Sequence, residues 1–185
     1  MCRKWRMDMA RSRIEIQNLA EHILEEAGIQ PCFKPMISKI VASQGLRVAP
    51  ALNLPESVYS TLLLQDIEGD KVASRLNSVI SVNASKADQE QRFAVAYQVA
   101  FYALYQSEAG QHESRLTASE LYREDDDSLR LACALLMNEG LFLDKFKKAL
   151  KGIPNRVAVC KNLAAQFGVP QYAVERRAKD LDLQI

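Results

Sequence analysis

Histidine and cysteine are among the commonest zinc ligands in proteins, and this 185-residue chain contains few of either. It has two histidines, His22 and His112, which lie 90 positions apart in unrelated contexts. His22 falls at an expected exposed position of a helix, and His112 falls in a polar stretch. A site made of two histidines and a glutamate would need both, so we expect each to be a solvated residue and not a ligand.

The four cysteines form no C-x-x-C pair and no Cys-His cluster. They are Cys2, Cys32, Cys133 and Cys160. This pattern predicts reduced thiols in a cytoplasmic protein. No stretch has the roughly 18 apolar residues that a membrane-spanning helix needs, and the N-terminus lacks the apolar segment of a secretory signal.

Composition is that of a globular domain, with 48% apolar and 25% charged residues. The formal net charge is +1, so no overall field attracts the chain to nucleic acid or membrane, although a local basic patch remains compatible with this balance. No phosphate-binding glycine loop and no Ser-His-Asp arrangement is present.

The element that must position any chemistry is a helix over residues 91–106, which are rich in Ala and lack Gly and Pro. Aromatic residues recur at every fourth position, and residues four apart lie above one another on a helix. They are Phe93, Tyr97, Phe101 and Tyr105. Most other positions are Ala, Val or Leu, which predicts a helix buried on nearly all sides.

The centre of this helix reads Y-Q-V-A-F, from Tyr97 to Phe101. In a helical H-E-x-x-H motif, two imidazoles one turn apart bind a zinc ion and the Glu serves as general base. Here Tyr97 and Phe101 stand at the two histidine positions, and Gln98 stands at the glutamate position.

The residues before this segment fit the pattern R-F-x-x-A-H-E-x-G-H. They are Arg92, Phe93 and Ala96. The segment therefore resembles the core motif of the ImmA/IrrE family of zinc-peptidase-like proteins. A second segment, D-S-L-R-L-A-C-A-L-L-M from Asp127 to Met137, resembles the family pattern E-x-E-A-N-x-F-A-x-x-L-L-M-P, with Ala132 matching. The resemblance places Asp127 where the third zinc ligand, a Glu, would stand. We interpret Asp127 as the acidic start of a helix, where the helix dipole favours negative charge.

The resemblance implies an α+β fold, a mostly helical zincin-like domain with a small antiparallel sheet. We predict a helix over residues 12–27, a second helix or a turn over 36–42, strands over 58–67 and 78–83, and a strand beginning at 46–48. Ile14, Leu19, Ile23 and Leu24 are expected to form the apolar face of the first helix. Residues 50–55 and 106–120 are read as loops. In zincin-like folds the strand before the metal helix borders the substrate cleft, so we expect a partner groove at Val79, Ser81, Asn83 and Tyr97.

A helical module is predicted over residues 141–185, packed on a zincin-like domain of residues 1–140. Residues 157–181 resemble a helix-turn-helix, with Ala164, Gly168 and Val174 at the usual spacing. Its second helix would offer Gln171, Arg176 and Arg177 as nucleic-acid contacts. These basic residues come late in the helix and are offset by nearby acids, so structural packing is the favoured interpretation.

Three functions follow from these patterns. The favoured hypothesis is a catalytically inactive pseudopeptidase that needs no cofactor and binds a protein, such as a helix-turn-helix repressor of a mobile element. The alternatives are a DNA-binding regulator acting through the C-terminal module, and an active peptidase whose chemistry uses other residues.

Overall fold

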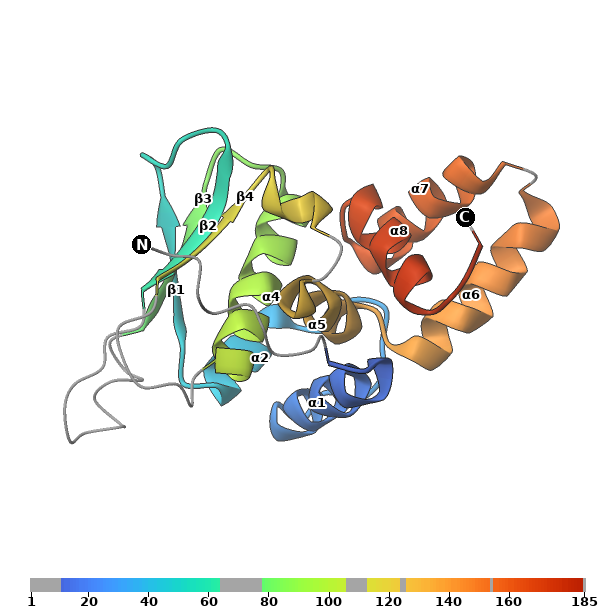
Figure 1. Cartoon of the computed structure of the whole chain (residues 1–185), viewed down its shortest axis with the longest axis horizontal. Helices are drawn as coiled ribbons and strands as arrows, with labels where there is room; N and C mark the ends of the chain where they lie inside the picture. The colour runs from blue at the N-terminus through green and yellow to red at the C-terminus, as the bar shows by residue number, and fades with distance from the viewer. Residues whose placement is uncertain (1–10, 64–77, 106–112, 124–125, 154, 185) are drawn as a thin grey trace.

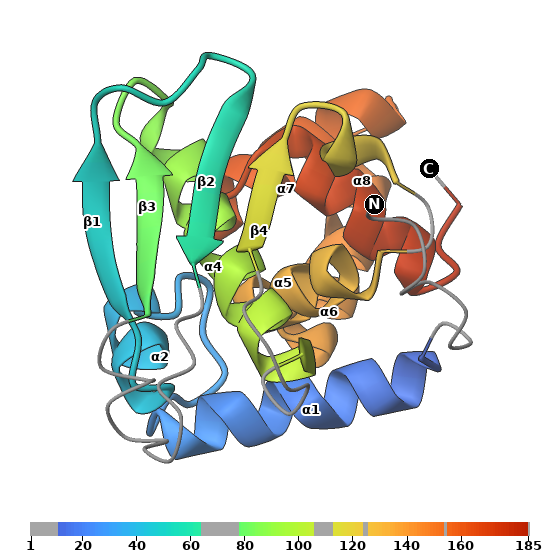
Figure 2. The same cartoon turned by 60° about the vertical axis from the view of Figure 1, so that its left-hand side comes forward.

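The computed structural model describes residues 11–63, 78–105, 113–123, 126–153 and 155–184. These residues form a four-stranded sheet with the helices gathered on one of its faces (Figure 1). Turning the molecule brings the sheet forward and shows helix α4 directly behind it (Figure 2). The predicted α+β architecture is confirmed. No helix within the described ranges is long and apolar enough to cross a bilayer.

The sheet has the strand order β1-β3-β2-β4. Its strands are β1 (Arg47–Ala51), β2 (Val58–Leu63), β3 (Val79–Asn83) and β4 (Glu113–Thr117). β2 pairs antiparallel with both β3 and β4, whereas β1 pairs parallel with β3. The sheet is therefore mixed and not purely antiparallel as expected, because β3 inserts between β1 and β2.

Two predicted loops contain strands. β4 lies in the stretch that was expected to be a loop over residues 106–120, and Pro50 lies inside β1. Ser114 and Leu116 of β4 are buried and pair with Leu62 and Ser60 of β2. The strand carries a single apolar residue, which is why its sequence reads as a loop.

The helix-facing side of the sheet is set by the strand register. The Ser60 hydroxyl donates to the Ala94 carbonyl of α4 (3.2 Å), so Ser60 points toward the helices. Its cross-strand partners Val82 and Leu116 share that face because paired residues lie on the same side of a sheet. Residues one position away, including Ser81 and Thr61, must point to the opposite face.

The helices, with one short 3-10 helix, η1, end near their predicted positions. They are α1 (Arg13–Glu26), α2 (Ile37–Ser43), α4 (Asp88–Tyr105), η1 (Glu120–Tyr122), α5 (Asp127–Leu136), α6 (Glu139–Gly152), α7 (Arg156–Phe167) and α8 (Gln171–Asp180). Ser12 and Glu15 form a capping box at the start of α1. Ile14 is 70% exposed, contrary to prediction, because the buried stripe of α1 runs through Ile16 and Ala20 instead.

Helix α4 is the central element, as its sequence predicts. Phe93, Tyr97 and most of its alanines are buried, and it packs against α5, β2 and β3. The C-terminal helices join the same core, since α8 packs on α5 and its Tyr172 ring meets Phe93 edge-on at 5.4 Å. The predicted boundary between residues 140 and 141 falls inside α6, and the division into two domains stays a prediction.

Candidate functional site

The first degenerate position, Tyr97, points from α4 toward the start of α5. Only 5% of Tyr97 is exposed, and its hydroxyl donates to Oδ2 of Asp126 at 3.4 Å. Burial raises the pKa of Tyr97 far above its ordinary value, and the negative charges of Asp126 and Glu120 raise it further. Tyr97 therefore stays protonated, and its hydroxyl is unsuited to act as a base or as a metal ligand.

The second position, Gln98, points into the interface between α4 and the sheet. It is completely buried, and its Nε2 donates to the hydroxyl of Ser60 on β2 at 2.9 Å. Because Ser60 in turn donates to the Ala94 carbonyl, the two side chains fix α4 against β2. The Gln98 Oε1 atom is buried and has no hydrogen-bond partner among the described residues.

The third position, Phe101, is half-buried, and its ring centroid lies 4.8 Å from that of Tyr105. Tyr97, Gln98 and Phe101 thus contact α5, the sheet and a neighbouring ring respectively. Their side chains offer no converging set of imidazole or carboxylate donors. Within the described ranges, no three His, Cys, Asp or Glu side chains lie together so as to hold a metal ion. The residues present do not fit the zinc site that the resemblance implies.

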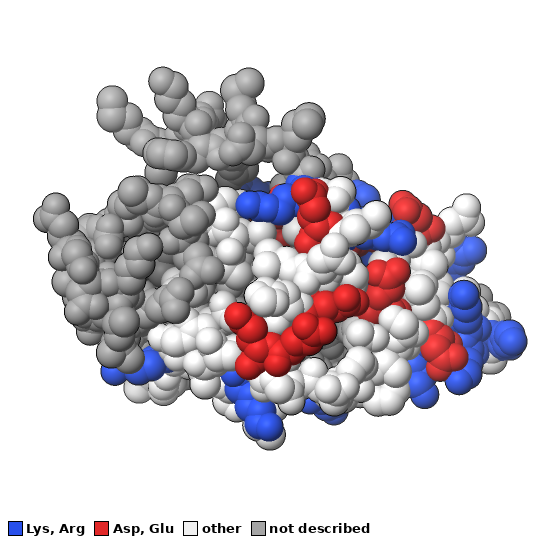
Figure 3. All heavy atoms as spheres, turned by 90° about the horizontal axis from the view of Figure 1, so that it is seen from below, with Lys and Arg blue, Asp and Glu red and all other residues white. Residues whose placement is uncertain are grey.

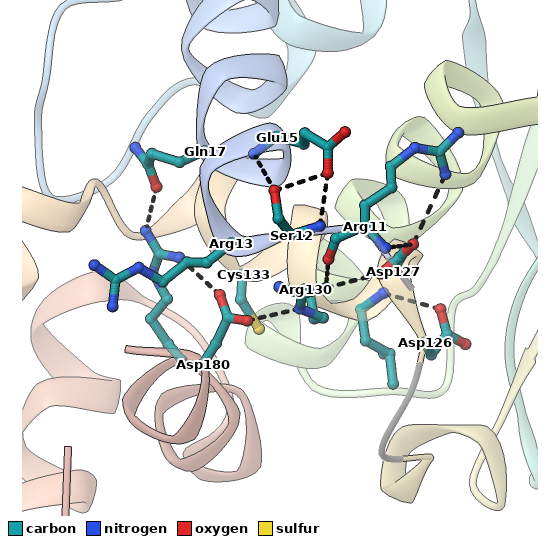
Figure 4. Close-up of polar contacts among 12 residues, drawn as sticks. Arg11, Ser12, Arg13, Glu15, Gln17, Asp126, Asp127, Arg130, Cys133 and Asp180 are labelled. Atoms are coloured by element: carbon teal, nitrogen blue, oxygen red, sulfur yellow. Dashed lines mark hydrogen bonds and ion pairs between the residues drawn. The ribbon is translucent and has the colours of Figure 1, made fainter. Parts of the chain in front are cut away.

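Asp127, at the position of the third ligand, belongs to a different set of contacts. One carboxylate oxygen accepts from the Arg11 main-chain N–H at 3.0 Å, and the other accepts from Arg130 at 2.9 Å (Figure 4). The neighbouring Asp126 caps α5 by accepting from the N–H groups of Ser128 and Leu129. Asp127 is therefore the acidic start of a helix, as interpreted from sequence, and it is also an ion-pair partner.

The contacts of Asp127 extend into an acid–arginine cluster, which we define as Arg11, Asp127, Arg130, Arg177 and Asp180. Figure 4 labels Asp127, Arg130 and Asp180, at the centre of this cluster. Arg130 Nε donates to Asp180 at 2.6 Å, and Asp180 also pairs with Arg177 at 3.3 Å. Burial alone would lower the pKa of Arg130, but the hydrogen bonds and charges of Asp180 and Asp127 outweigh it and raise that pKa.

Sequence reasoning missed this cluster. Its only local signals are two i,i+3 spacings, Asp127 with Arg130 and Arg177 with Asp180, which are compatible with ion pairs on helices. The Arg130–Asp180 pair spans 50 positions, and periodicity within one segment carries no information about it.

The predicted partner groove is not assembled. β3 is paired on both edges, by β1 and β2, so no further strand can join it. Val79 and Ser81 point away from α4, whereas Tyr97 lies on the helix side. Asn83 is buried and donates to the carbonyls of Val58 (2.8 Å) and Pro55 (3.2 Å). Asn83 therefore holds the turn before β2 and does not line a groove.

The helix-turn-helix segment forms, but its second helix is a core element. Arg177 has no exposed surface, and its guanidinium donates to the Met137 carbonyl (3.2 Å) and to Gln17 (2.7 Å). Gln171 is half-buried and donates to Glu175, and Arg176 is also half-buried. Among residues 171–180 Lys179 is exposed, and the others are half-buried or buried. Arg177 cannot contact nucleic acid here, which corrects its assignment.

Arg92 holds the turn between α7 and α8 in place. Its guanidinium donates to the carbonyls of Phe167 and Gly168, both at 2.9 Å, and to that of Pro35 at 3.0 Å. Gly168 adopts a positive φ of 63°, which ends α7, and a Cβ there would lie 3.1 Å from Lys34. The motif arginine thus joins α4 to the turn between α7 and α8.

The remaining candidate ligands lie apart. His22 is exposed and lies 3.5 Å from Glu26, and His112 is outside the described residues. Cys133 is fully buried, and burial raises its pKa to about 12, whereas Cys32 is exposed. Cys2 also falls outside the described residues.

The family model for the IrrE N-terminal-like domain matches residues 24–179. The chain belongs to this family. The match covers α4, α5 and most of the C-terminal helices, so the resemblance read from the two motifs is confirmed. A search of curated proteins gave no match. In this family member the motif positions hold the core together, through Gln98 and Ser60, and through Tyr97 and Asp126.

Proposed function

We propose that this chain is a catalytically inactive, cytoplasmic member of the IrrE N-terminal-like family that binds another protein. The observation that carries the proposal is Gln98, which stands at the general-base position and is fully buried against Ser60. A general base must reach the proton that it abstracts. A metal ion that activates a water must be held by protein side chains that coordinate it directly. Neither Gln98 nor its neighbours Tyr97 and Phe101 meets these requirements.

The partner expected from the family resemblance is a helix-turn-helix repressor of a mobile element, since family members often act on such repressors. A member without peptidase chemistry would sequester or shield the repressor and would leave it intact. A partner can bind by adding one of its own strands to the edge of this sheet. This mode uses main-chain groups and needs no metal ion, so it is compatible with the absence of the zinc ligands.

The docking edge proposed here is β4, because the topology excludes β3. Of the two edge strands, β1 contains Pro50. Arg47 and Ala51 hydrogen-bond to the β3 side, so by alternation Pro50 faces outward and offers no N–H there. At the end of β4, Glu120 already accepts from the Thr117 N–H at 2.8 Å, so a partner strand would pair with the part of β4 before Thr117.

The test combines metal content with binding to a purified helix-turn-helix repressor from a mobile element. We expect elemental analysis of untagged protein to give far less than one zinc per chain, and the repressor to remain uncleaved. In a titration with that repressor, Arg115→Glu on β4 should weaken binding at least tenfold. Arg47→Glu is the matched control, an exposed arginine on the other edge strand, and should bind as the unmodified chain does.

Stoichiometric zinc or cleavage of the repressor would favour an active peptidase and would contradict the proposal. Equal weakening by Arg47→Glu and Arg115→Glu would show that the net charge of the chain, and not the strand that carries the substitution, controls binding. That result would rule out β4 as the docking edge. Failure of any repressor to bind would leave the inactive-enzyme part supported and would overturn the binding part.

A further inference from the structure

The positive charges of this chain are unevenly distributed. From Lys145 to Val174 there are six Lys and Arg residues and no Asp or Glu. The rest of the chain carries 18 Lys and Arg against 23 Asp and Glu, so it is acidic overall. The formal net charge of +1 therefore conceals a basic segment of 30 residues on an otherwise negative molecule.

The fold gathers this charge on one end of the molecule. Five of the six cations are exposed on α6 and α7, which pack against each other. They are Lys147, Lys148, Lys151, Arg156 and Lys161, which we call the basic end. Figure 3 shows blue atoms gathered at the side where α6 and α7 lie in Figure 1, and a row of red atoms across the middle of the same view.

Most of these cations are available for an external anion. Lys148 pairs with Asp144 at 2.8 Å, and the other four form no ion pair with any described residue. The first turn of α7 contains no acidic residue and begins with Arg156, although an acid there would be favoured by the helix dipole. Asp144 lies near Lys145, Lys147 and Lys148, but positive charge remains in excess at this end of the molecule. A polyanion would relieve the repulsion between these cations.

We propose that the basic end binds the phosphate backbone of double-stranded DNA without reading base sequence. Evenly spaced phosphates match a set of lysines and arginines spread over two helices. The structure disfavours base reading, because Arg177 of α8 is buried and Gln171 and Arg176 are half-buried. This surface uses other residues than β4 and does not depend on the function proposed above.

A membrane surface is the competing polyanion, and the structure disfavours it. Insertion into lipid needs a continuous apolar face, and the large apolar residues of α6, Phe142 and Phe146, face the core. Among the residues that the structure describes at this end, the exposed large apolar ones are Leu150 and Val157. They are single residues on different helices and do not form such a face.

The experiment is fluorescence anisotropy of a labelled mixed-sequence DNA duplex titrated with the full chain at several salt concentrations. Binding at about 50 mM salt should weaken steeply at higher salt, with log K falling by about 0.9 per phosphate contact for each unit of log salt. The variant Lys147→Gln/Lys151→Gln/Arg156→Gln should lose at least tenfold in affinity and lower that slope by about three.

The matched control changes three exposed cations elsewhere, Lys39→Gln/Arg47→Gln/Arg123→Gln, which alters the net charge equally. It should retain most of the affinity and the slope of the unmodified chain. Both variants change exposed residues, and equal melting temperatures would show that they fold. Absence of duplex binding at 50 mM salt, equal losses in both variants, or tighter binding to phosphatidylserine vesicles than to DNA would each overturn the proposal.

Discussion

The two regions that would supply zinc ligands in this family have changed in different ways. On α4 the positions are occupied by the neutral residues Tyr97, Gln98 and Phe101, which pack into the core. On α5 the position holds a carboxylate, Asp127, which forms an ion pair with Arg130 and accepts a hydrogen bond from the Arg11 main-chain N–H. Neutral groups can be buried at modest cost, whereas a buried charge requires partners.

This difference indicates where the fold tolerates change. The side chains at the α4 positions are held by packing and by single hydrogen bonds, so each contributes to stability only through its immediate neighbours. Asp127 belongs to a cluster in which four of the five charged side chains, all except Arg11, have more than one partner. The cluster joins α5 to α8, and Arg177 bonds to Gln17 of α1. We therefore expect substitutions in the cluster to destabilise the protein more than substitutions at Tyr97, Gln98 and Phe101.

The largest expected effect is at Asp180, whose side chain is 6% exposed and lies between two arginines. Asp180→Ala leaves Arg130 and the buried Arg177 without this partner, and we expect the free energy of unfolding to fall by ~3–5 kcal/mol. Chemical denaturation followed by circular dichroism measures it. The control is Lys148→Ala, which removes the exposed pair with Asp144 and should cost no more than ~1 kcal/mol. Similar values for the two variants would refute the ranking.

The next effect compares two aromatic positions of α4. Tyr97→Ala empties a buried position and should lower the free energy of unfolding by about 3 kcal/mol. Phe101→Ala should cost clearly less, because Phe101 is only half-buried. Equal costs would mean that Phe101 contributes as a core residue. No cost at Tyr97 would show that its side chain faces solvent.

The smallest effect is expected at Gln98, where two substitutions of similar size separate packing from charge. Gln98→Met removes the Oε1 atom that has no partner among the described residues, and stability should change by no more than about 1.5 kcal/mol. Gln98→Glu restores the family residue but buries a carboxylate beside Ser60, which should raise the pKa of that carboxylate above its unfolded value.

The pH dependence of Gln98→Glu follows from that shift. Below the unfolded pKa of about 4.3 the glutamic acid is neutral in both states, and its penalty is smallest. As pH rises through the folded pKa, the variant should lose stability relative to Gln98→Met. Thermal melts of both variants at pH 5 and pH 8 test this. A glutamate variant that gains stability between pH 5 and pH 8 would contradict the buried position of Gln98.

Much of the fold could be predicted because its signals are local. Helix α4 is recognisable from composition and from the aromatic spacing, and β3 from its alternation. β4 was missed because a strand with only Leu116 as an apolar residue is fixed by its pairing with β2. The parallel pairing of β1 with β3 likewise depends on which strands become neighbours.

The sequence predicted which residues occupy the candidate site, but it did not predict how their side chains are arranged. The motif resemblance located the degenerate positions, yet it could not show that Gln98 faces Ser60 or that β3 lies inside the sheet. The burial of Arg177 shows the same limit. Its charge suggested a surface contact, and only the packing of α8 on α1 and α5 reveals its role.

The position of α8 has a consequence for how the protein is made. Helix α8 comes after the other described helices in the chain and still lies in the core, with Tyr172 on Phe93 of α4 and Arg177 bonded to Gln17 of α1, 160 positions earlier. Contacts of such high sequence separation slow folding. Until residues 171–180 have left the ribosome, the apolar surface of α5 and the Phe93 ring that α8 covers remain open to solvent. The nascent chain is therefore most prone to aggregation before α8 has emerged, and truncation upstream of α8 should yield aggregated protein and not a shorter domain.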